Sequence, residues 1–295
     1  METAQVKTSD KISLRPGEAG DAEALGRICY EAFRTISEAH NFPPDFPAPE
    51  AAVGMINMAL NLPAIYSVGA ENWSGQAVGS NFLWEFDSVS GVGPITIDPA
   101  VQNSSIGRTL MEDVIRRSDE QGHPSVRLVQ AAYHNRSLSL YTKLGFDTVE
   151  PLSLMQGDAI GRKIDGYSVR QMTDSDLDEV DALTLRVHGH SRRNEVAAAI
   201  SQGTANLIEH DGRITGYTTT VGFFGHTVGE SNEDIKALIA SAESFPGSGF
   251  LLPSRNGELM RWCFENGLRV IQPMTLMARG LYQKPRGAFL PSILY

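Results

Sequence analysis

A run of small and polar residues in the first half of the chain stands directly before an amphipathic helix pattern that continues to residue 120. The run consists of Gln102, Asn103, Ser104, Ser105, Ile106, Gly107 and Arg108. The first N–H groups of a helix lack partners within the helix, and the helix dipole gives this end positive character. Because small side chains let an anion reach these groups, the run predicts a phosphate or pyrophosphate site. A plain helix cap is the alternative, since the glycine-rich dinucleotide and P-loop motifs are both absent.

The neighbouring elements would bring a second polar group to this turn. A β-branched run at 94–97 predicts a buried strand leading into it, and 125–129 predicts a second strand. Residues 134–144 then follow a helix pattern that Gly145 closes in the position of a left-handed C-cap. Tyr141 in this helix is either a proton donor or an aromatic residue of the core.

This segment resembles the GNAT superfamily of acyl-coenzyme A dependent N-acetyltransferases. Members of that family usually carry Gln/Arg-x-x-Gly-x-Gly/Ala in the turn, and the corresponding places here hold Gln102, Ser105 and Gly107. Serine thus replaces the first glycine. The pattern Asn-x-x-x-x-x-Tyr-x-x-x-Gly-Phe, which starts at Asn135 and includes Tyr141, is similar to the helix that follows in the family.

The resemblance implies that acetyl-coenzyme A is the cosubstrate, that no metal takes part, and that the acceptor is a small-molecule amine or a peptide amine. The turn at 102–108 would hold the pyrophosphate, and Asn135 would hydrogen-bond the pantetheine region. Backbone groups of the preceding strand would bind the pantetheine arm and polarise the thioester carbonyl; its residues are Ile95, Thr96 and Ile97. Tyr141 would protonate the departing thiolate, because the pKa of a phenol is near enough to that of a thiol for proton transfer.

The acceptor side is less clearly marked. The proline-rich stretch at 40–49 contains Phe42 and Phe46, and it is either a rigid connection between helices or a wall of the acceptor pocket. Glu85 and Asp87, near the end of an expected strand at 79–86, are candidate general bases. Solvated charges at a strand end are the alternative for both carboxylates.

Composition limits the class of partner. The chain has 295 residues, 41% of them hydrophobic, and a formal net charge of −10. Because no basic run is present, we expect neither nucleic acid nor an anionic membrane as a partner. Cys29 and Cys263 lie on apolar helix patterns and are expected to be buried. Without a signal peptide or a membrane span in the sequence, we expect a cytoplasmic protein, either monomer or homodimer.

An internal repeat predicts the domain organisation. Residues 144–155 align with 266–277, with identical Gly, Pro, Leu and Met. The expected fold class is α/β (an α+β mixed sheet) with two tandem GNAT-like domains, each a mostly antiparallel mixed sheet flanked by helices. The expected boundaries are 1–157 for a catalytic domain, 158–166 for a linker, 167–280 for a degenerate second domain and 281–295 for an extended tail.

The second copy has lost the residues that carry the chemistry. Cys263 stands where the first copy has Tyr141, and Gly257 stands for Asn135. Residues 229–234 carry three carboxylates in the place of the phosphate turn, where they would repel an anion. We therefore expect coenzyme A to bind only the first copy. Because one half has decayed, a non-catalytic acyl-coenzyme A sensor or interaction scaffold is the alternative function.

The apolar tail should pack rather than extend into water, and its prolines forbid a regular helix. Either it docks between the domains, or Tyr295 reaches the acceptor site and holds the amine.

Overall fold

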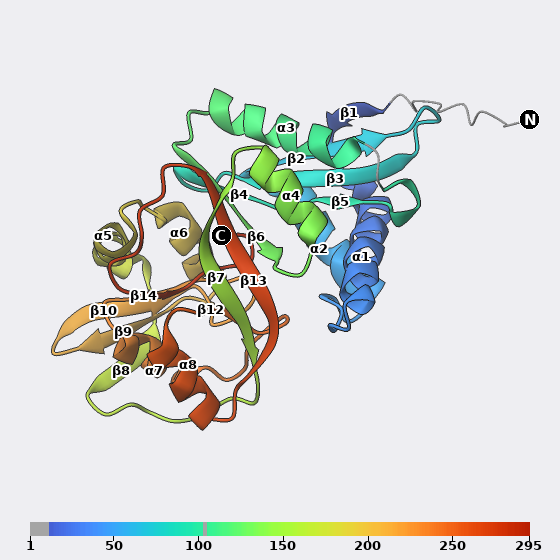
Figure 1. The fold of residues 1–295 in the computed structure, drawn as a ribbon. Helices are drawn as coiled ribbons and strands as arrows, with labels where there is room; N and C mark the ends of the chain where they lie inside the picture. Colours follow the sequence, from blue (N-terminus) through green and yellow to red (C-terminus); the bar gives the residue numbers. More distant parts are fainter. Residues whose placement is uncertain (1–11, 103–104) are drawn as a thin grey trace, which may run out of the picture.

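The computed structural model describes residues 12–102 and 105–295, which form two sheets with helices on their faces (Figure 1). The first half contains β1 (Ser13–Pro16), α1 (Ala22–Ala39), α2 (Pro49–Asn61), β2 (Ile65–Glu71), β3 (Ala77–Trp84), β4 (Val89–Val92), β5 (Thr96–Ile97), α3 (Ile106–Glu120), β6 (Ser125–Ala131), α4 (Asn135–Lys143) and β7 (Asp147–Gln156). The second half contains β8 (Tyr167–Gln171), α5 (Leu177–His188), α6 (Arg193–Ser201), β9 (Asn206–His210), β10 (Arg213–Thr218), β11 (Thr227–Gly229), α7 (Asn232–Ser241), β12 (Phe250–Pro253), α8 (Gly257–Glu265), β13 (Arg269–Gly280) and β14 (Ala288–Leu290). The mixed α/β fold class is confirmed.

One expected turn is a strand. The small, glycine-containing sequence Ser88-Val89-Ser90-Gly91 favours a turn, but β4 begins at Val89 and pairs with β6. The small residues serve close packing instead. Gly91 lies directly under the main-chain oxygen of Leu294, so a Cβ atom at this position would collide with the tail.

The two halves exchange a strand. In the larger sheet the order is β1-β2-β3-β4-β6-β13-β7-β12, so β13 separates β6 from β7, and β7 separates β13 from β12. The repeated strands β7 and β13 therefore lie side by side and antiparallel, with Met274 opposite Leu152 (Figure 1). Each half contributes its last repeated strand, β7 or β13, to pairing with a strand of the other half. The two strands therefore have similar neighbours, which explains why the copies are so similar in these strands. The boundary expected at residue 157 divides the repeat in the sequence but does not divide the sheet.

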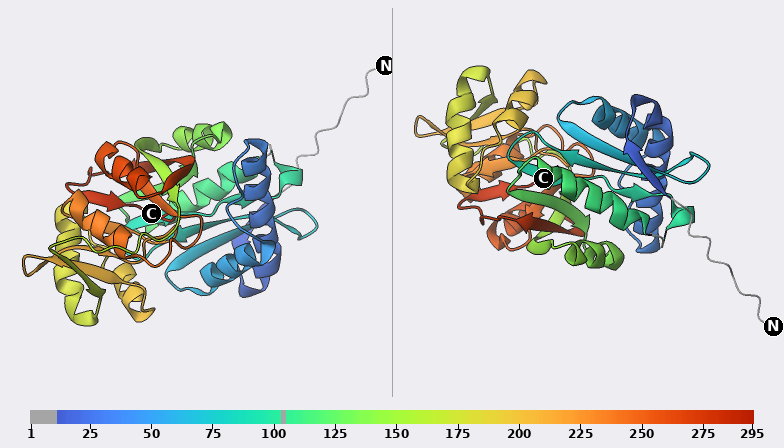
Figure 2. Two further views of the ribbon diagram at one scale, coloured as in Figure 1. Left: turned by 90° about the horizontal axis from the view of Figure 1, so that it is seen from below. Right: turned by 90° about the horizontal axis from the view of Figure 1, so that it is seen from above.

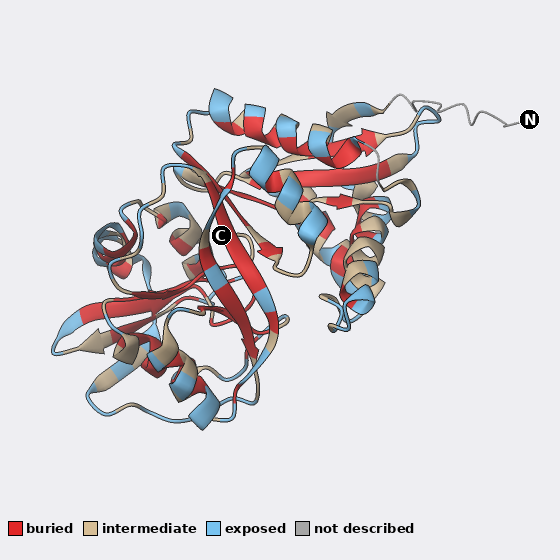
Figure 3. Cartoon of the chain, viewed as in Figure 1, coloured by how far each residue is buried: buried red, intermediate tan, exposed pale blue. Residues whose placement is uncertain are grey.

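Helices cover both faces of the first sheet and create two cores. α3 turns a buried side to the sheet and an exposed side to solvent (Figure 3). Its apolar stripe packs with strand residues such as Leu83 and Val126 and with Tyr141 of α4. On the other face, α1 and α2 pack over Phe82 and Ile65. No helix in the described ranges is long and apolar enough to cross a membrane.

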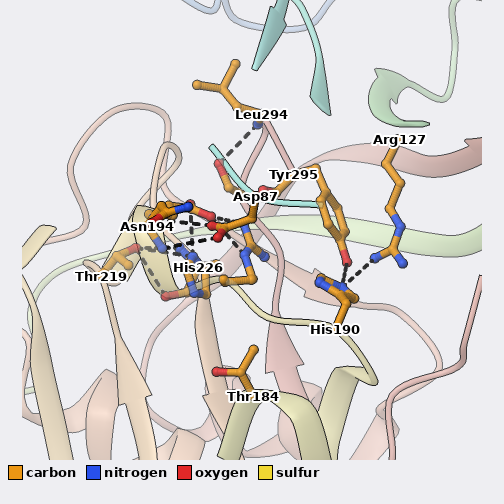
Figure 4. A network of polar contacts seen from close by, with 12 residues as sticks. Asp87, Arg127, Thr184, His190, Asn194, Thr219, His226, Leu294 and Tyr295 are labelled. Atoms are coloured by element: carbon orange, nitrogen blue, oxygen red, sulfur yellow. Dashed lines mark hydrogen bonds and ion pairs between the residues drawn. The ribbon is translucent and has the colours of Figure 1, made fainter. Parts of the chain in front are cut away.

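The tail lies in the seam between the halves (Figures 2 and 4). The Tyr295 ring packs 4.1 Å from the guanidinium carbon of Arg127 and 4.8 Å from that of Arg192. Its hydroxyl lies 3.0 Å from Nε2 of His190, and Arg192 donates to its main-chain oxygen. Part of the tail is regular, because β14 pairs with β11.

A polar network also joins the halves (Figure 4). The carboxylate of Asp87 accepts hydrogen bonds from the N–H groups of Asn194 and Glu195 at the start of α6, at 3.1 and 3.2 Å. Glu195 forms an ion pair with Arg192 at 2.7 Å, and its other carboxylate oxygen lies 3.1 Å from Nδ1 of His226.

Replacing Glu195 by glutamine is expected to lower the melting temperature at neutral pH, because the buried guanidinium of Arg192 loses its carboxylate partner. Burial alone would raise the pKa of Glu195, but Arg192 and His226 lower it from 4.5 to about 2. Such a carboxylate stabilises the fold above its unfolded pKa and loses this effect as the pH falls toward its folded pKa. The difference in melting temperature between parent and variant should therefore shrink below about pH 4.5. A difference that stays constant down to about pH 3 would contradict this role.

Candidate active site

Two neighbouring strands diverge at the centre of the larger sheet. β4 runs parallel to β6 and pairs with it as far as Gly91 and Arg127. Beyond these residues the chain turns at Gly93 and Pro94, and β5 pairs with β3 instead. Trp84 holds this turn, since its indole Nε1 donates to the Gly93 carbonyl at 2.6 Å. The edges of β5 and β6 that face each other are therefore unpaired and leave a V-shaped opening in the sheet.

A main-chain donor is available at this opening. The N–H of Gly93 donates to the carbonyl of Phe82 at 3.0 Å, and Pro94 has no N–H. The N–H of Ile95 donates to no main-chain oxygen in the part of the chain that the structure describes. This group is free to hydrogen-bond a ligand carbonyl, which is the use predicted for this strand.

The facing strand contributes an amide side chain. Val126 and Leu128 of β6 lie in the core beneath α3 and α4, so strand alternation places Gln130 on the same face. Gln130 is 6% exposed, and neither its amide nitrogen nor its amide oxygen has a hydrogen-bond partner among the described residues. Because leaving buried amide groups unpaired costs free energy, the opening suits a ligand with amide groups of its own, as the pantetheine arm has.

The predicted anion turn lies at the end of this opening. Gln102 is held there by two contacts: its Nε2 donates to the Ile97 carbonyl at 3.2 Å, and its Oε1 accepts from Arg136 at 2.6 Å. Ser105 directly precedes α3, whereas Asn103 and Ser104 lie outside the described residues. A Cβ atom on Gly107 would lie 2.9 Å from Cδ1 of Ile97, so the turn packs closely on β5.

Two arginines lie near the turn. Arg108 is exposed and pairs with Glu112 at 3.3 Å. Arg136, in the first turn of α4, reaches the anion turn through Gln102, and sequence reasoning missed it. The signal available was a cationic side chain immediately after Asn135. Unlike the two arginines, Ile106 is buried. Its side chain is 2% exposed and belongs to the core.

Tyr141 faces the same core as Ile95 and Ile97. Its side chain is 7% exposed. Burial raises the pKa of its phenol to about 12, although the interaction with Ser137 lowers that pKa. The Ser137 hydroxyl is in turn 2.6 Å from Nδ1 of His134. The phenol of Tyr141, the hydroxyl of Ser137 and the imidazole of His134 therefore neighbour one another along the first turns of α4.

This geometry agrees with a comparison to protein families. Residues 31–146, which include the turn, the opening and Tyr141, match the model of the Acetyltransferase (GNAT) family. This segment of the chain is thus similar to the GNAT family.

Two sequence relatives agree with this comparison, and a solved structure has the same fold. The uncharacterized N-acetyltransferase YitH of Bacillus subtilis is 26% identical over 158 residues, covering 52% of this chain and 54% of YitH. The chain thus matches about half the length of that relative. The D-amino-acid N-acetyltransferase HPA3 of Saccharomyces cerevisiae is 26% identical over 165 residues, covering 53% of this chain and 98% of HPA3. A solved structure of a candidate acetyltransferase from Pyrococcus horikoshii has the same fold over 100% of this chain and 96% of its own, with a TM-score of 0.72 and 14% identity.

Asn135 and Glu85 occupy different surroundings in the first half of the chain. Asn135 is exposed at the start of α4, beside the turn. Glu85 pairs with Arg117 in the last turn of α3, with contacts of 3.0 Å. The anion turn precedes the first turn of this helix, about 16 Å away along its axis. Glu85 is thus engaged far from the turn, and Asp87 caps α6.

The predicted acceptor residues fall into two groups. Phe42 stacks on Tyr133 with ring centroids 4.4 Å apart, and Phe46 packs on Phe33 at 6.1 Å. Both phenylalanines therefore lie in the loop between α1 and α2, whereas Tyr295 packs in the seam between the two halves. Thr96 faces the α1 side of the sheet, and its hydroxyl is buried without a partner in the described chain.

Among the residues that the structure describes, the second copy has no opening comparable to that of the first. Its strand β11 pairs with β14 on the edge that corresponds to the unpaired one in the first half. Ser231 and Asp234 form a capping box at the start of α7, and Asp234 accepts hydrogen bonds from the N–H and the hydroxyl of Ser231 at 2.8 and 2.7 Å. Both observations favour one coenzyme site per chain.

Proposed function

We propose that the first half of the chain transfers an acetyl group from acetyl-coenzyme A to a primary amine. The observation that carries the proposal is the opening between β5 and β6, where a free N–H, an unpaired buried amide and the anion turn lie on neighbouring segments and suit a thioester, a pantetheine arm and a pyrophosphate. The residues named for these contacts are Ile95, Gln130 and the turn at 102–108. Arg136 adds positive charge beside the turn.

The chain's own groups then supply the chemistry. The N–H of Ile95 hydrogen-bonds the carbonyl oxygen, on which negative charge develops as the amine attacks. Tyr141 gives its phenolic proton to the sulfur when the carbon–sulfur bond breaks, and Ser137 and His134 hold the phenol in place. Burial of these groups excludes water, so the acetyl group passes to the amine and not to solvent.

The test is release of free thiol from acetyl-coenzyme A with a panel of primary amines, combined with calorimetric titration of the coenzyme. Binding together with thiol release supports the enzyme. Binding without thiol release for any amine supports a non-catalytic acyl-coenzyme A sensor instead.

Calorimetry is expected to give one coenzyme per chain, and Gly107→Glu is expected to abolish binding. A glutamate here must enter the space beside Ile97, and its carboxylate would oppose the pyrophosphate. Gly107→Ala is the matched control, because its methyl group displaces only the flexible end of Ile97, so most of the affinity should remain. A stoichiometry near two, or unchanged affinity in Gly107→Glu, would contradict the assignment.

A further inference from the structure

A carboxylate with neutral partners lies in the loop between α1 and α2. Asp45 is partly buried, and its Oδ1 accepts a hydrogen bond of 3.3 Å from Nε2 of Gln272. The hydroxyl of Ser37 lies near enough to lower the pKa of the carboxylate. Ser248 holds the main chain, donating to the Asp45 carbonyl at 3.1 Å. Gln272 belongs to β13, so the strand lent by the second half positions this group.

Asp45 has no counter-ion. Among the residues that the structure describes, no lysine, arginine or histidine forms an ion pair with it. The titratable groups nearby are the buried thiol of Cys29 on α1 and the phenol of Tyr133 after β6. Burial raises the pKa of both, and the charge of Asp45 adds to the rise. His40, directly after α1, packs against Tyr133 with ring centroids 5.1 Å apart. Burial raises the pKa of Asp45 to about 6, although Gln272 and Ser37 lower it. A desolvated carboxylate of this kind is stabilised by a bound cation.

The surroundings of Asp45 are aromatic. Phe42 stacks on Tyr133, and Phe46 follows Asp45 directly and packs on Phe33. The hydroxyl of Tyr133 donates to Oε1 of Gln272 at 3.2 Å, which turns the amide so that its nitrogen faces Asp45. Aromatic rings and an unpaired carboxylate together suit an organic ammonium ion.

The location connects this cluster to the proposed reaction. Tyr133 follows the last residue of β6 by two positions, and His134 begins the helix that carries Tyr141. Val129 and Ala131 face away from the core beneath α3 and α4, toward the side where Asp45 lies with α1. An acceptor bound at Asp45 would therefore approach the strands from the face opposite to the pantetheine groups.

We propose that Asp45 binds the ammonium group of the acceptor and takes one proton from it, with Gln272 orienting the carboxylate. This inference rests on the proposed acetyl transfer. The neutral amine nitrogen then forms a bond to the thioester carbon, the carbon–sulfur bond breaks, and its electron pair goes to sulfur, which receives a proton from Tyr141. The nitrogen loses its second proton to water, and Asp45 and Tyr141 exchange protons with solvent before the next turnover.

The charge also selects the class of acceptor. A carboxylate next to the amine, as in an α-amino acid, would lie close to Asp45 and be repelled. The site therefore favours primary amines that have no neighbouring carboxylate and that carry an apolar or aromatic group for Phe42 and Tyr133.

The test compares the parent with Asp45→Asn. The probes are 2-phenylethylamine and both enantiomers of phenylalanine, which differ from it by a carboxylate. In the parent, kcat/KM should fall below about pH 6, because the proton acceptor must be ionised. Asp45→Asn should lower kcat/KM about 10²–10⁴-fold. Its pH profile should no longer show the fall below about pH 6, and its rate should rise with pH as neutral amine accumulates. Phenylalanine should be a poor acceptor for the parent.

Three further measurements make the outcome decisive. Glu50→Gln removes a solvated carboxylate five residues away and should change neither the rate nor the pH profile. Gln272→Met should shift the acidic fall in kcat/KM to higher pH, because the Asp45 carboxylate loses a donor that lowers its pKa. Calorimetry of 2-phenylethylamine with the coenzyme A complex should show at least tenfold weaker binding in Asp45→Asn, which separates amine binding from turnover.

Parent-like rate and pH profile in a folded Asp45→Asn, or a preference for phenylalanine, would overturn the inference while leaving acetyl transfer intact. If the parent releases no thiol with any amine, the proposed function fails, and the calorimetric comparison still decides whether Asp45 binds amines.

Discussion

Replacing Tyr141 by phenylalanine is expected to lower kcat by about 10²–10⁴-fold, because only the proton donor is lost. The ring should stay in place, since it is 7% exposed and packs edge-on against Phe146 at 6.3 Å. The affinity for coenzyme A, measured by calorimetry, should change little. The phenol must be protonated to act, and burial raises its pKa to about 12, so the parent should show no alkaline loss of activity near pH 10 from this group.

Ser137→Ala is the matched control for this substitution. It keeps the phenol but removes the neighbour that lowers its pKa, so kcat should fall less than in Tyr141→Phe. If Tyr141→Phe keeps a kcat within about threefold of the parent, water or another group protonates the sulfur. Tyr141 would then be a core aromatic residue, which was the alternative from the sequence.

The parts of the site that depend on local sequence could be predicted. The turn before α3 and Tyr141 in α4 are set by helix signals within a few residues, and the structure brings both to one opening. Asp45 and Arg136 were missed because their partners, Gln272 and Gln102, are distant in the chain. Glu85 carries no local signal of its ion pair with Arg117, a residue 32 positions away.

The exchange of strands could not be predicted from the repeat alone. Residues 144–155 and 266–277 have the same apolar pattern, so either strand satisfies the same neighbours. The tail and the contact between Asp87 and α6 join the halves in the arrangement in which β13 lies beside β6. The repeat was visible in the sequence, but its geometry depends on contacts between residues more than 100 positions apart.

A fragment comprising residues 12–166 is expected not to fold alone. It lacks β13, which pairs with β6 along seven residues from Met274 to Gly280 and with β7 on its other edge. Without this strand, β6 and β7 present unpaired main-chain groups, and the cores lose Met277, Leu276 and Met274. We expect the fragment to aggregate or to show no cooperative melting by circular dichroism.

Co-expression of the fragment with residues 167–295 is expected to restore a soluble complex that binds coenzyme A, because both exchanged strands are then present. The matched control is the same pair with Leu276→Asp, which buries a charge at a position that is 1% exposed and should prevent recovery. Size-exclusion chromatography and calorimetry measure assembly and binding. A fragment that melts cooperatively and binds coenzyme A alone would show that β6 and β7 can pair directly. In that case the second half would not be needed to complete the sheet, and its contribution would be limited to the acceptor side, through Gln272.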